Sequence, residues 1–268
     1  MHSELAAMFG LSGRVALVTG GASNLGHDAA EVLASAGCDV IVTSRSMERA
    51  KSAASQIART YGVQTLPLAL DHTDSAQVQD VVTRAARWHG HLDILVNNAG
   101  NGPSSGMGLF DRRPEDVAAM IAGNLTGPLS CCREAAQVMV EQGNGKIINI
   151  ASIAGMIGRD RRMYERHGMA GQPLDYGAAK GGVIAMTRDL AAMLSPKGIY
   201  VNAISPGGFA RKQSPSGFVA EYADRTPLGH MGRDGIDLKG AVVFLASAAS
   251  DYVTGHNLVV DGGFSIWR

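Results

Sequence analysis

The pair Tyr176 and Lys180 is the feature of this sequence best suited to acid–base chemistry. Residues four apart on a helix lie on one face, about a turn from each other, so the ammonium of Lys180 can approach the phenol of Tyr176. A cation about 4 Å from a phenol favours the phenolate by up to about 4 kcal/mol at an effective dielectric of about 20. Because each ~1.4 kcal/mol shifts a pKa by one unit, we predict that Lys180 lowers the pKa of Tyr176 from its usual value near ~10 toward working pH. Such pairs also occur by chance, so whether this one is catalytic depends on the motifs found in the rest of the chain.

A glycine turn follows the first expected strand. The apolar run at 14–18 is typical of a strand buried on both faces, and it leads directly into Thr19-Gly20-Gly21-Ala22-Ser23-Asn24-Leu25-Gly26. Apolar residues then recur with a helical period as far as Ala36. A glycine turn between strand and helix presents backbone N–H groups and the positive helix end to a pyrophosphate. The turn could be a plain connection, but its position after the first strand favours a dinucleotide site.

Strand and helix patterns alternate along the rest of the chain. We expect further strands at 40–43, 65–70, 92–96, 146–151, 200–204 and 258–260, and helices near 46–60, 74–89, 114–141, from Tyr176 onward, and near 235–248. Repeated β-α units predict an α/β fold with a single Rossmann-type doubly wound parallel sheet and helices on both faces. Ligands of such sheets bind beyond the carboxyl ends of the strands. Gly20, Asp71, Asn97 and Ser152 all fall at such ends, so one crevice could collect them.

Length and composition predict one large domain covering residues 1–268. No linker divides the chain, and 46% of its residues are hydrophobic. Lys plus Arg equals Asp plus Glu at 24 each, which gives no reason to expect nucleic acid or an anionic membrane as partner. The start of the chain, at 1–4, has no basic signal region, and no apolar run approaches the ~20 residues of a membrane span, so we expect a cytoplasmic protein. Cys38, Cys131 and Cys132 have neither a disulfide pattern nor metal-ligand spacing, so we expect buried thiols and no metal.

These motifs together resemble the short-chain dehydrogenase/reductase family from about residue 11 onward. The resemblance is carried by the turn from Thr19-Gly20 to Gly26, Asn97-Asn98-Ala99-Gly100, Asn124-Leu125-Thr126-Gly127, Ser152, Tyr176 with Lys180, Asn202-Ala203-Ile204-Ser205-Pro206-Gly207 and Asp261-Gly262-Gly263. Each motif is modest by itself, but their order and their places at strand ends are specific. The resemblance implies a nicotinamide cofactor, reversible hydride transfer between an alcohol and a carbonyl compound, and a homotetramer.

The resemblance also implies roles for individual residues. Tyr176 would exchange the proton of the substrate oxygen, and Ser152 would hydrogen-bond that oxygen as charge develops on it. Lys180 would favour the phenolate and hold the nicotinamide ribose, while Asn124 would steady a water leading away from Lys180. The residues expected to contact the cofactor are Gly20, Ser23, Asn24, Leu25, Gly26, Ser44, Arg45, Asp71, Asn98, Ala99, Gly100, Tyr176, Lys180, Pro206, Gly207 and Phe209.

The sequence departs from the family pattern at several positions. The glycine turn usually reads TGxxxGxG, and Asn24 replaces its middle glycine; asparagine tolerates the left-handed conformation, so we expect the turn to form. Arg211 stands where the family commonly has threonine, which puts a hydroxyl contact to the cofactor in doubt. The interval between Ser152 and Tyr176 is about ten residues longer than usual. Tyr164 lies nearer the ordinary distance but has Gly168 four residues on, so we prefer Tyr176.

The end of the second strand bears on the choice of cofactor. An NAD enzyme of this type usually has a carboxylate there for the ribose hydroxyls, whereas this chain has Ser44 followed by Arg45. The missing carboxylate and the guanidinium both suit a 2′-phosphate, although Arg45 could equally be an exposed residue that opens the next helix. We therefore favour NADP and keep NAD as the alternative. Asp71 is expected to contact the adenine.

Two segments are expected near the substrate. The inserted stretch 156–175 is either a solvated loop or part of the pocket rim, and in the second case its arginines would suit an anionic substrate such as a sugar acid. Its basic residues are Arg159, Arg161, Arg162, Arg166 and His167. The segment 209–228 folds over the substrate as a lid in the family, with Arg211, Lys212, Phe218 and Tyr222 as candidate lining residues. The pair Gly181-Gly182 and the stretch 251–263 suggest tight subunit contacts.

Three functions compete at this point. The first is an NADP- or NAD-dependent oxidoreductase that acts on a small alcohol or ketone, such as a polyol or sugar acid. The second is a catalytically silent, cofactor-binding regulatory protein of the same fold, which the joint presence of Asn124, Ser152, Tyr176 and Lys180 disfavours. The third is a sugar-nucleotide epimerase or dehydratase, which would need a longer carboxy-terminal substrate domain than this chain has after Lys180.

Overall fold

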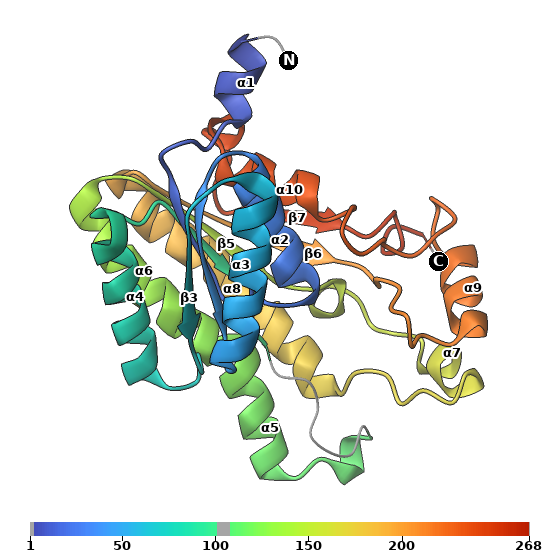
Figure 1. The fold of residues 1–268 in the computed structure, drawn as a ribbon. Coiled ribbons are helices and arrows are strands. Elements are labelled where there is room, and N and C mark those ends of the chain that lie inside the picture. Colours follow the sequence, from blue (N-terminus) through green and yellow to red (C-terminus); the bar gives the residue numbers. More distant parts are fainter. Residues whose placement is uncertain (1–2, 101–107, 268) are drawn as a thin grey trace.

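The fold is built on a seven-stranded parallel sheet, which confirms the predicted α/β architecture (Figure 1). The computed structural model describes residues 3–100 and 108–267. The strand order is β3-β2-β1-β4-β5-β6-β7, and every strand pairing is parallel. The strands are β1 (Val15–Val18), β2 (Asp39–Ser44), β3 (Thr65–Ala69), β4 (Ile94–Asn97), β5 (Gly145–Ile150), β6 (Ile199–Pro206) and β7 (Asn257–Val260). The chain winds outward from β1 to β3 and then outward from β4 to β7, so the winding direction switches between β1 and β4.

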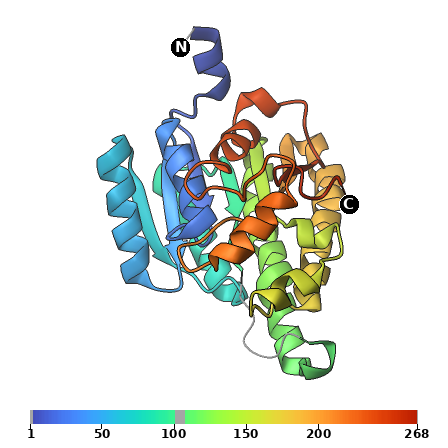
Figure 2. The same ribbon diagram turned by 90° about the vertical axis from the view of Figure 1, so that its right-hand side faces the viewer.

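Helices cover both faces of this sheet (Figures 1 and 2). One layer consists of α2 (Asn24–Ser35), α3 (Met47–Tyr61) and α10 (Lys239–Ala246). The other consists of α4 (Ser75–His89), α6 (Gly127–Gln142) and α8 (Leu174–Leu194). Strand β1 is apolar throughout because both of its faces are buried. Ala16 and Val18 pack against the first helical layer, and Val15 and Leu17 pack against the second. None of the described helices combines the length and apolarity needed to cross a membrane.

The region predicted as one helix at 114–141 is interrupted. It contains α5 (Pro114–Ile121), a π-helical turn η2 (Ala122–Thr126) and then α6. His72 stabilises this turn, because its Nε2 lies 2.7 Å from the carbonyl oxygen of Gly123 and must donate to it. Burial lowers the pKa of His72, which keeps the imidazole neutral near pH 7. A π-turn widens the helix locally and changes the direction of its side chains, and Asn124 lies within this one.

Several elements were not predicted from the sequence. Helix α1 (Ser3–Phe9) precedes the sheet, α7 (Arg161–Arg166) lies within the inserted stretch, and α9 (Ser216–Asp224) lies within the lid segment. The helix expected at 235–248 is shorter, as α10. Short 3₁₀ turns occur at η1 (Leu109–Asp111), η3 (Ile153–Gly155), η4 (Ser195–Lys197) and η5 (Ala248–Ser250). Helices α7 and α9 lie side by side beyond the carboxyl ends of the central strands (Figures 1 and 2).

Candidate active site

Two adjoining cavities open beyond the carboxyl ends of the strands. The first has a volume of about 600 Å³ and lies where the winding direction of the sheet switches, between the turn after β1 and the ends of β4 and β5. The second has a volume of about 580 Å³ and lies between the inserted stretch and the lid segment. Among the described residues, those that line both cavities are Ser152, Gln172, Tyr176, Gly207 and Arg211. The cavities therefore meet at two of the predicted catalytic residues.

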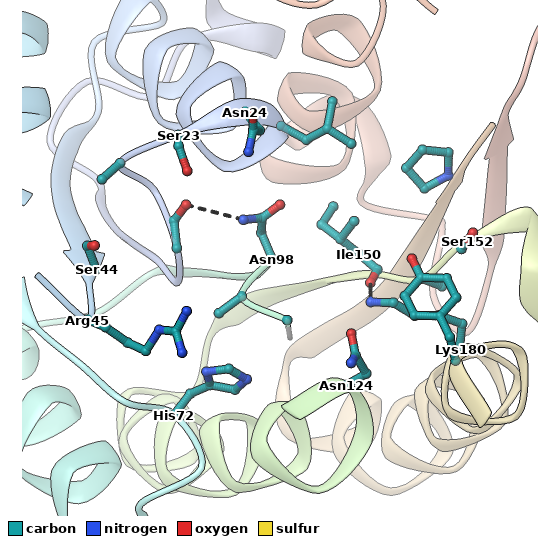
Figure 3. Close-up of a pocket in the computed structure, with 18 of the residues that line it drawn as sticks. Ser23, Asn24, Ser44, Arg45, His72, Asn98, Asn124, Ile150, Ser152 and Lys180 are labelled. Atoms are coloured by element: carbon teal, nitrogen blue, oxygen red, sulfur yellow. Dashed lines mark hydrogen bonds between the residues drawn. The ribbon is translucent and has the colours of Figure 1, made fainter. Parts of the chain in front are cut away.

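The glycine turn is held in place by the end of β4 (Figure 3). The hydroxyl of Thr19 accepts hydrogen bonds of 3.0 Å from the backbone N–H groups of both Asn98 and Ala99. The side-chain amide of Asn98 in turn donates to the carbonyl oxygens of Thr19 and Gly20, at 3.1 and 3.3 Å. A β-carbon on Gly26 would lie 2.3 Å from that amide nitrogen, so only glycine permits this approach. The arrangement leaves a cradle with room for a pyrophosphate at the start of α2.

Asn24 adopts the left-handed backbone conformation expected at the position where the family usually has glycine. Its φ is 52°, the only positive value at a non-glycine residue among the described parts of the chain. The expectation that asparagine supports this turn is therefore confirmed. Its side-chain oxygen accepts a 3.1 Å hydrogen bond from Arg211, which also pairs with Asp234 at 2.5 Å. Arg211 thus connects the lid segment to the glycine turn.

Ser152, Tyr176 and Lys180 converge from β5 and α8. Ser152 follows β5, and its hydroxyl caps η3 by accepting from the N–H of Ala154 at 3.1 Å. Turn η3 packs directly on α8, because a β-carbon on Gly155 would lie 2.5 Å from the backbone nitrogen of Gly181. Lys180 is buried, and its Nζ donates a 2.8 Å hydrogen bond to the carbonyl oxygen of Ile150 (Figure 3). These contacts fix the serine and the lysine relative to one another.

The charge balance around the phenol differs from the expectation based on spacing. Burial raises the pKa of Tyr176, while a hydrogen bond with Ser152 and the charge of Arg159 lower it. Lys180 does not supply the expected shift: burial lowers its own pKa to about 8, and its Nζ lies 5.8 Å from the centroid of the Tyr176 ring. The prediction assumed an ammonium about 4 Å away at a half-solvated site. In the structure this ammonium is desolvated and directed at a strand carbonyl.

Asn124 faces the first cavity from the π-helical turn (Figure 3). It is buried, and its amide nitrogen donates to the carbonyl oxygen of Met120 at 3.1 Å. A β-carbon on Gly100 would lie 2.6 Å from the Asn124 side-chain oxygen, so glycine at the end of this motif leaves room for the amide. The π-turn therefore places the side chain of Asn124 at the first cavity.

The connection after β2 and the first turn of α3 each provide one arginine to the first cavity. Ser44, Arg45 and Arg49 line its edge, together with Ser46, whose hydroxyl accepts from the N–H of Arg49 and caps α3. Among the described residues, no carboxylate is ion-paired with Arg45 or Arg49. Two guanidinium groups beside a helix N-terminus form a suitable environment for a phosphate. Arg49 was not singled out in the sequence, although a second arginine four residues after Arg45, in the first turn of the next helix, could have indicated it.

Most residues predicted to bind the cofactor line the first cavity. They are Gly20, Ser23, Asn24, Leu25, Ser44, Arg45, Asn98, Ala99, Gly100, Tyr176, Lys180, Pro206 and Gly207. Gly26 does not line this cavity but packs against Asn98 and the backbone of Gly20 within the turn. Phe209 lines the second cavity instead. Asp71 does not line the first cavity, although its neighbours Leu70 and His72 do. Its carboxylate accepts hydrogen bonds from the backbone N–H and the hydroxyl of Thr73, which lower the pKa of Asp71. No motif in the sequence marked His72.

The inserted stretch and the lid together form the wall of the second cavity. Met163 and Tyr164 of α7 pack against Phe218 and Tyr222 of α9, with Met231 in the same cluster. Polar contacts tie the same two helices together. Glu221 of α9 accepts hydrogen bonds from Arg166, from His167 at 2.9 Å and from Arg225 at 2.8 Å. The inserted stretch thus lines the second cavity, and its contribution to a substrate pocket stays a prediction.

The basic residues of this stretch differ in whether they reach the second cavity. Arg161 and Arg162 are exposed and do not line the second cavity; Arg162 pairs with Asp160 at 2.8 Å. Arg159 does line it. Both glycines of the pair Gly181-Gly182 are close-packed within the chain, since Gly181 contacts Gly155 and a β-carbon on Gly182 would lie 2.9 Å from Leu125; a role in subunit contacts stays a prediction.

The three cysteines are buried free thiols. Burial raises the pKa of Cys131 to about 12, so this thiol is neutral and unreactive at physiological pH. Within residues 3–100 and 108–267, no group of three His, Cys, Asp or Glu side chains is placed to hold a metal ion.

Comparison with known proteins gives a consistent assignment. A family model described as enoyl-(acyl carrier protein) reductase matches residues 20–265. A 3-oxoacyl-(acyl-carrier-protein) reductase from Aquifex aeolicus is 33% identical over 257 residues, which cover 94% of this chain and 98% of that protein. Gluconate 5-dehydrogenase from Gluconobacter oxydans is 34% identical over 265 residues, covering 97% of both.

A solved structure shares the whole fold. Gluconate 5-dehydrogenase from Burkholderia cenocepacia, crystallised with NADP and tartrate, superposes with a TM-score of 0.88 at 33% identity, covering 98% of this chain and 100% of that one. The agreement extends over both helical layers and the sheet, and the relatives are oxidoreductases of CH–OH and carbonyl groups. The chain therefore belongs to the short-chain dehydrogenase/reductase family of NAD(P)-dependent oxidoreductases.

Proposed function

We propose that this protein transfers hydride reversibly between NADP(H), bound in the first cavity, and an alcohol or carbonyl substrate bound in the second. The observation that carries the proposal is that Ser152 and Tyr176 line both cavities while Lys180 lines the first. Hydride transfer to a carbonyl needs a proton donor at the boundary between cofactor and substrate. These hydroxyls occupy that boundary. Candidate substrates are polyols, sugar acids and related hydroxy compounds, in keeping with the name of the gluconate 5-dehydrogenases.

The residues divide the chemistry among them. Tyr176 donates the proton to the substrate oxygen during reduction and removes it during oxidation, while the hydroxyl of Ser152 stabilises the developing negative charge. The nicotinamide ring supplies or accepts the hydride when the cofactor is bound. Lys180 holds a proton close to the cofactor ribose and the phenol. Asn124, presented by the π-turn, orders the water through which that proton exchanges with solvent.

We propose NADP as the preferred cofactor, with NAD as the alternative. The support is the absence of a carboxylate at Ser44 and the placement of Arg45 and Arg49 at the same edge of the first cavity. A 2′-phosphate would lie between two guanidinium groups there, whereas the ribose hydroxyls of NAD would find no carboxylate at Ser44. The gluconate 5-dehydrogenase of Burkholderia cenocepacia, a protein of the same fold, was crystallised with NADP.

The decisive experiment is a panel of polyols, sugar acids and ketones assayed with each cofactor for the wild type and for Tyr176→Phe. Removal of one general acid–base group costs about 100- to 10,000-fold in kcat. We expect a loss of this size with at least one compound, while cofactor binding measured by fluorescence is retained. Tyr164→Phe is the matched control, because Tyr164 lines only the second cavity. Equal turnover by Tyr176→Phe would refute the assigned proton donor.

The same experiment separates this function from that of a catalytically silent regulatory protein. A silent protein would bind NADPH but oxidise it with no member of the panel, and Tyr176→Phe would change nothing. We further propose that the enzyme works as a cytoplasmic homotetramer. The support is the resemblance to the family and, for the compartment, the three unbridged thiols.

A further inference from the structure

The lining of the second cavity is mainly apolar and aromatic near the lid. Met163, Phe218, Tyr222 and Met231 form one buried cluster there, with Tyr164 packed against it. A polyol placed against this wall would lose hydrogen bonds to water without gaining replacements, at a cost for each unpaired hydroxyl. Among the alcohols and carbonyl compounds proposed above, the wall therefore favours those whose body is hydrocarbon or aromatic over polyols and sugar acids.

Three arginines among the described residues line the same cavity, and two of them already have carboxylate partners. Arg225 pairs with Asp160 at 3.0 Å and with Glu221 at 2.8 Å. Arg211 pairs with Asp234 at 2.5 Å. Arg159 is the third; within the described chain it pairs with no carboxylate and donates a hydrogen bond to the backbone carbonyl of Pro173, at 3.1 Å. The nearby carboxylate of Asp160 is held by Arg162 and Arg225 instead.

The guanidinium of Arg159 also lies close to the reacting end of the cavity. Its Nη2 is 4.0 Å from the position that a β-carbon on Gly177 would occupy, next to Tyr176. Its charge lowers the pKa of the Tyr176 phenol, and burial lowers the pKa of Arg159 itself. A half-buried cation without an acidic partner is costly, and an anion supplied by a ligand would remove that cost. Such an anion would lie close to the carbon that gains or loses hydride.

We infer that Arg159 binds a carboxylate of the substrate, which is therefore an oxo or hydroxy acid with an apolar body and its acid group close to the reacting carbon. This inference rests on the proposed function, since it takes the second cavity as the substrate site. The guanidinium pairs with the carboxylate, the wall around Phe218 holds the body, and Tyr176 meets the carbonyl oxygen. Specificity for acids is then a property of the inserted stretch.

The test compares matched acids and esters. The probes are benzoylformate and 4-oxo-4-phenylbutyrate, each beside its methyl ester, which keeps the ketone and the ring but removes the charge. Dissociation constants are measured by calorimetry on the NADP-loaded protein, and kcat/KM with NADPH, for wild type, Arg159→Met, Arg159→Lys and Arg161→Met. Arg161→Met is the control, because Arg161 also donates to a backbone carbonyl of this stretch, that of Gln172 at 3.3 Å, but does not line the cavity.

We expect the wild type to bind at least one acid about tenfold or more tightly than its ester, since a charge-assisted pair discriminates by at least this factor. Arg159→Met should remove the preference by weakening the acid alone, Arg159→Lys should restore part of it, and Arg161→Met should leave it unchanged. Equal weakening of acid and ester by Arg159→Met, or no preference in the wild type, would overturn the inference. If the wild type binds an acid more tightly than its ester but oxidises no NADPH with it, Arg159 is supported as the acid-binding residue. Only the proposed oxidoreductase function is then contradicted.

Discussion

Lys180 illustrates how position in the fold, rather than spacing along a helix, sets the charge of one side chain. The four-residue spacing correctly placed it beside Tyr176, but burial and the carbonyl of Ile150 decide its protonation. Burial raises the pKa of the Tyr176 phenol and lowers that of Lys180 to about 8, so in the ligand-free protein the ammonium is the group of the pair that titrates nearer neutral pH.

Replacement of Lys180 by Met should stabilise the ligand-free protein at pH 7. The pKa of Lys180 in the folded protein, about 8, lies below the value of 10.5 in the unfolded chain, so the unfolded state binds more protons between these pH values and wild-type stability rises with pH through that window. Burying the ammonium of Lys180 costs of the order of 3 kcal/mol, and the substitution removes this cost but also loses the hydrogen bond to Ile150. We therefore expect the free energy of unfolding to rise by about 1–3 kcal/mol at pH 7, and by less above pH ~9.

Urea unfolding at pH 7 and pH 9.5 measures this difference. Lys51→Met is the control, because Lys51 is exposed and pairs weakly with Glu48 at 3.6 Å. A Lys180→Met protein less stable than the wild type at pH 7 would show that the ammonium is not penalised by burial. Catalytic activity should be lost in either case.

The double substitution Arg45→Ala with Arg49→Ala should change cofactor preference. Each guanidinium can contribute about 1.5–3 kcal/mol to a phosphate contact, so the Kd for NADPH should rise at least about tenfold while the Kd for NADH changes by less than about threefold. Fluorescence titration measures both values. Arg59→Ala, on an exposed part of the same helix, should alter neither. Parallel changes for the two cofactors would place the phosphate elsewhere.

At the scale of elements, the inserted stretch and the lid behave as one unit. The sequence marked both segments as additions near the substrate, but it did not predict that α7 and α9 would form and pack on each other. That pairing depends on contacts such as Glu221 with Arg166, which lie 55 residues apart along the chain and follow no local pattern. The π-turn was missed for a similar reason, because its partner His72 lies 51 residues away.

Substitution of Glu221 by Gln should loosen this unit. Hydrogen bonds from Arg166 and His167 lower the pKa of Glu221 to about 2, so the carboxylate is ionised at working pH and its contribution is lost only as pH falls from about 4.5 toward 2. We expect a several-fold increase in the KM of the substrate, little change in the Kd of NADPH, and faster hydrogen exchange in α7 and α9. Glu165→Gln, an exposed change on α7, is the control. Unchanged exchange in both helices would contradict the prediction.

At the scale of the whole molecule, the parallel sheet was predictable because each strand is an apolar run bounded by glycine or polar residues. β1 reads as four consecutive buried residues, and the glycine turn and Ser152 come directly after strands of this kind, whereas Tyr176 and Lys180 lie on α8. The second cavity was not predictable in the same way. Its wall combines Met163, Phe218 and Phe264 from three separate segments, and only the folded chain brings them together.

We expect the protein to be a homotetramer in solution, with a mass of about 112 kDa, four times the 27.9 kDa of one chain. Large apolar side chains remain exposed on the single chain, at Leu129 on α6, Leu174 and Met193 on α8, and Trp267 near the carboxyl terminus. Surfaces of this kind are commonly covered by partner subunits. Light scattering after gel filtration measures the mass, and a value near 28 kDa across micromolar concentrations would exclude assembly.

The glycine contact between η3 and α8 has a consequence for redesign. Because Gly155 and Gly181 join the serine-bearing and lysine-bearing segments backbone to backbone, the reactive groups do not rely on α7 or α9 for their alignment. Both of those helices could be exchanged for the corresponding segments of a relative. The resulting enzyme would then accept different substrates while it catalyses the same hydride transfer.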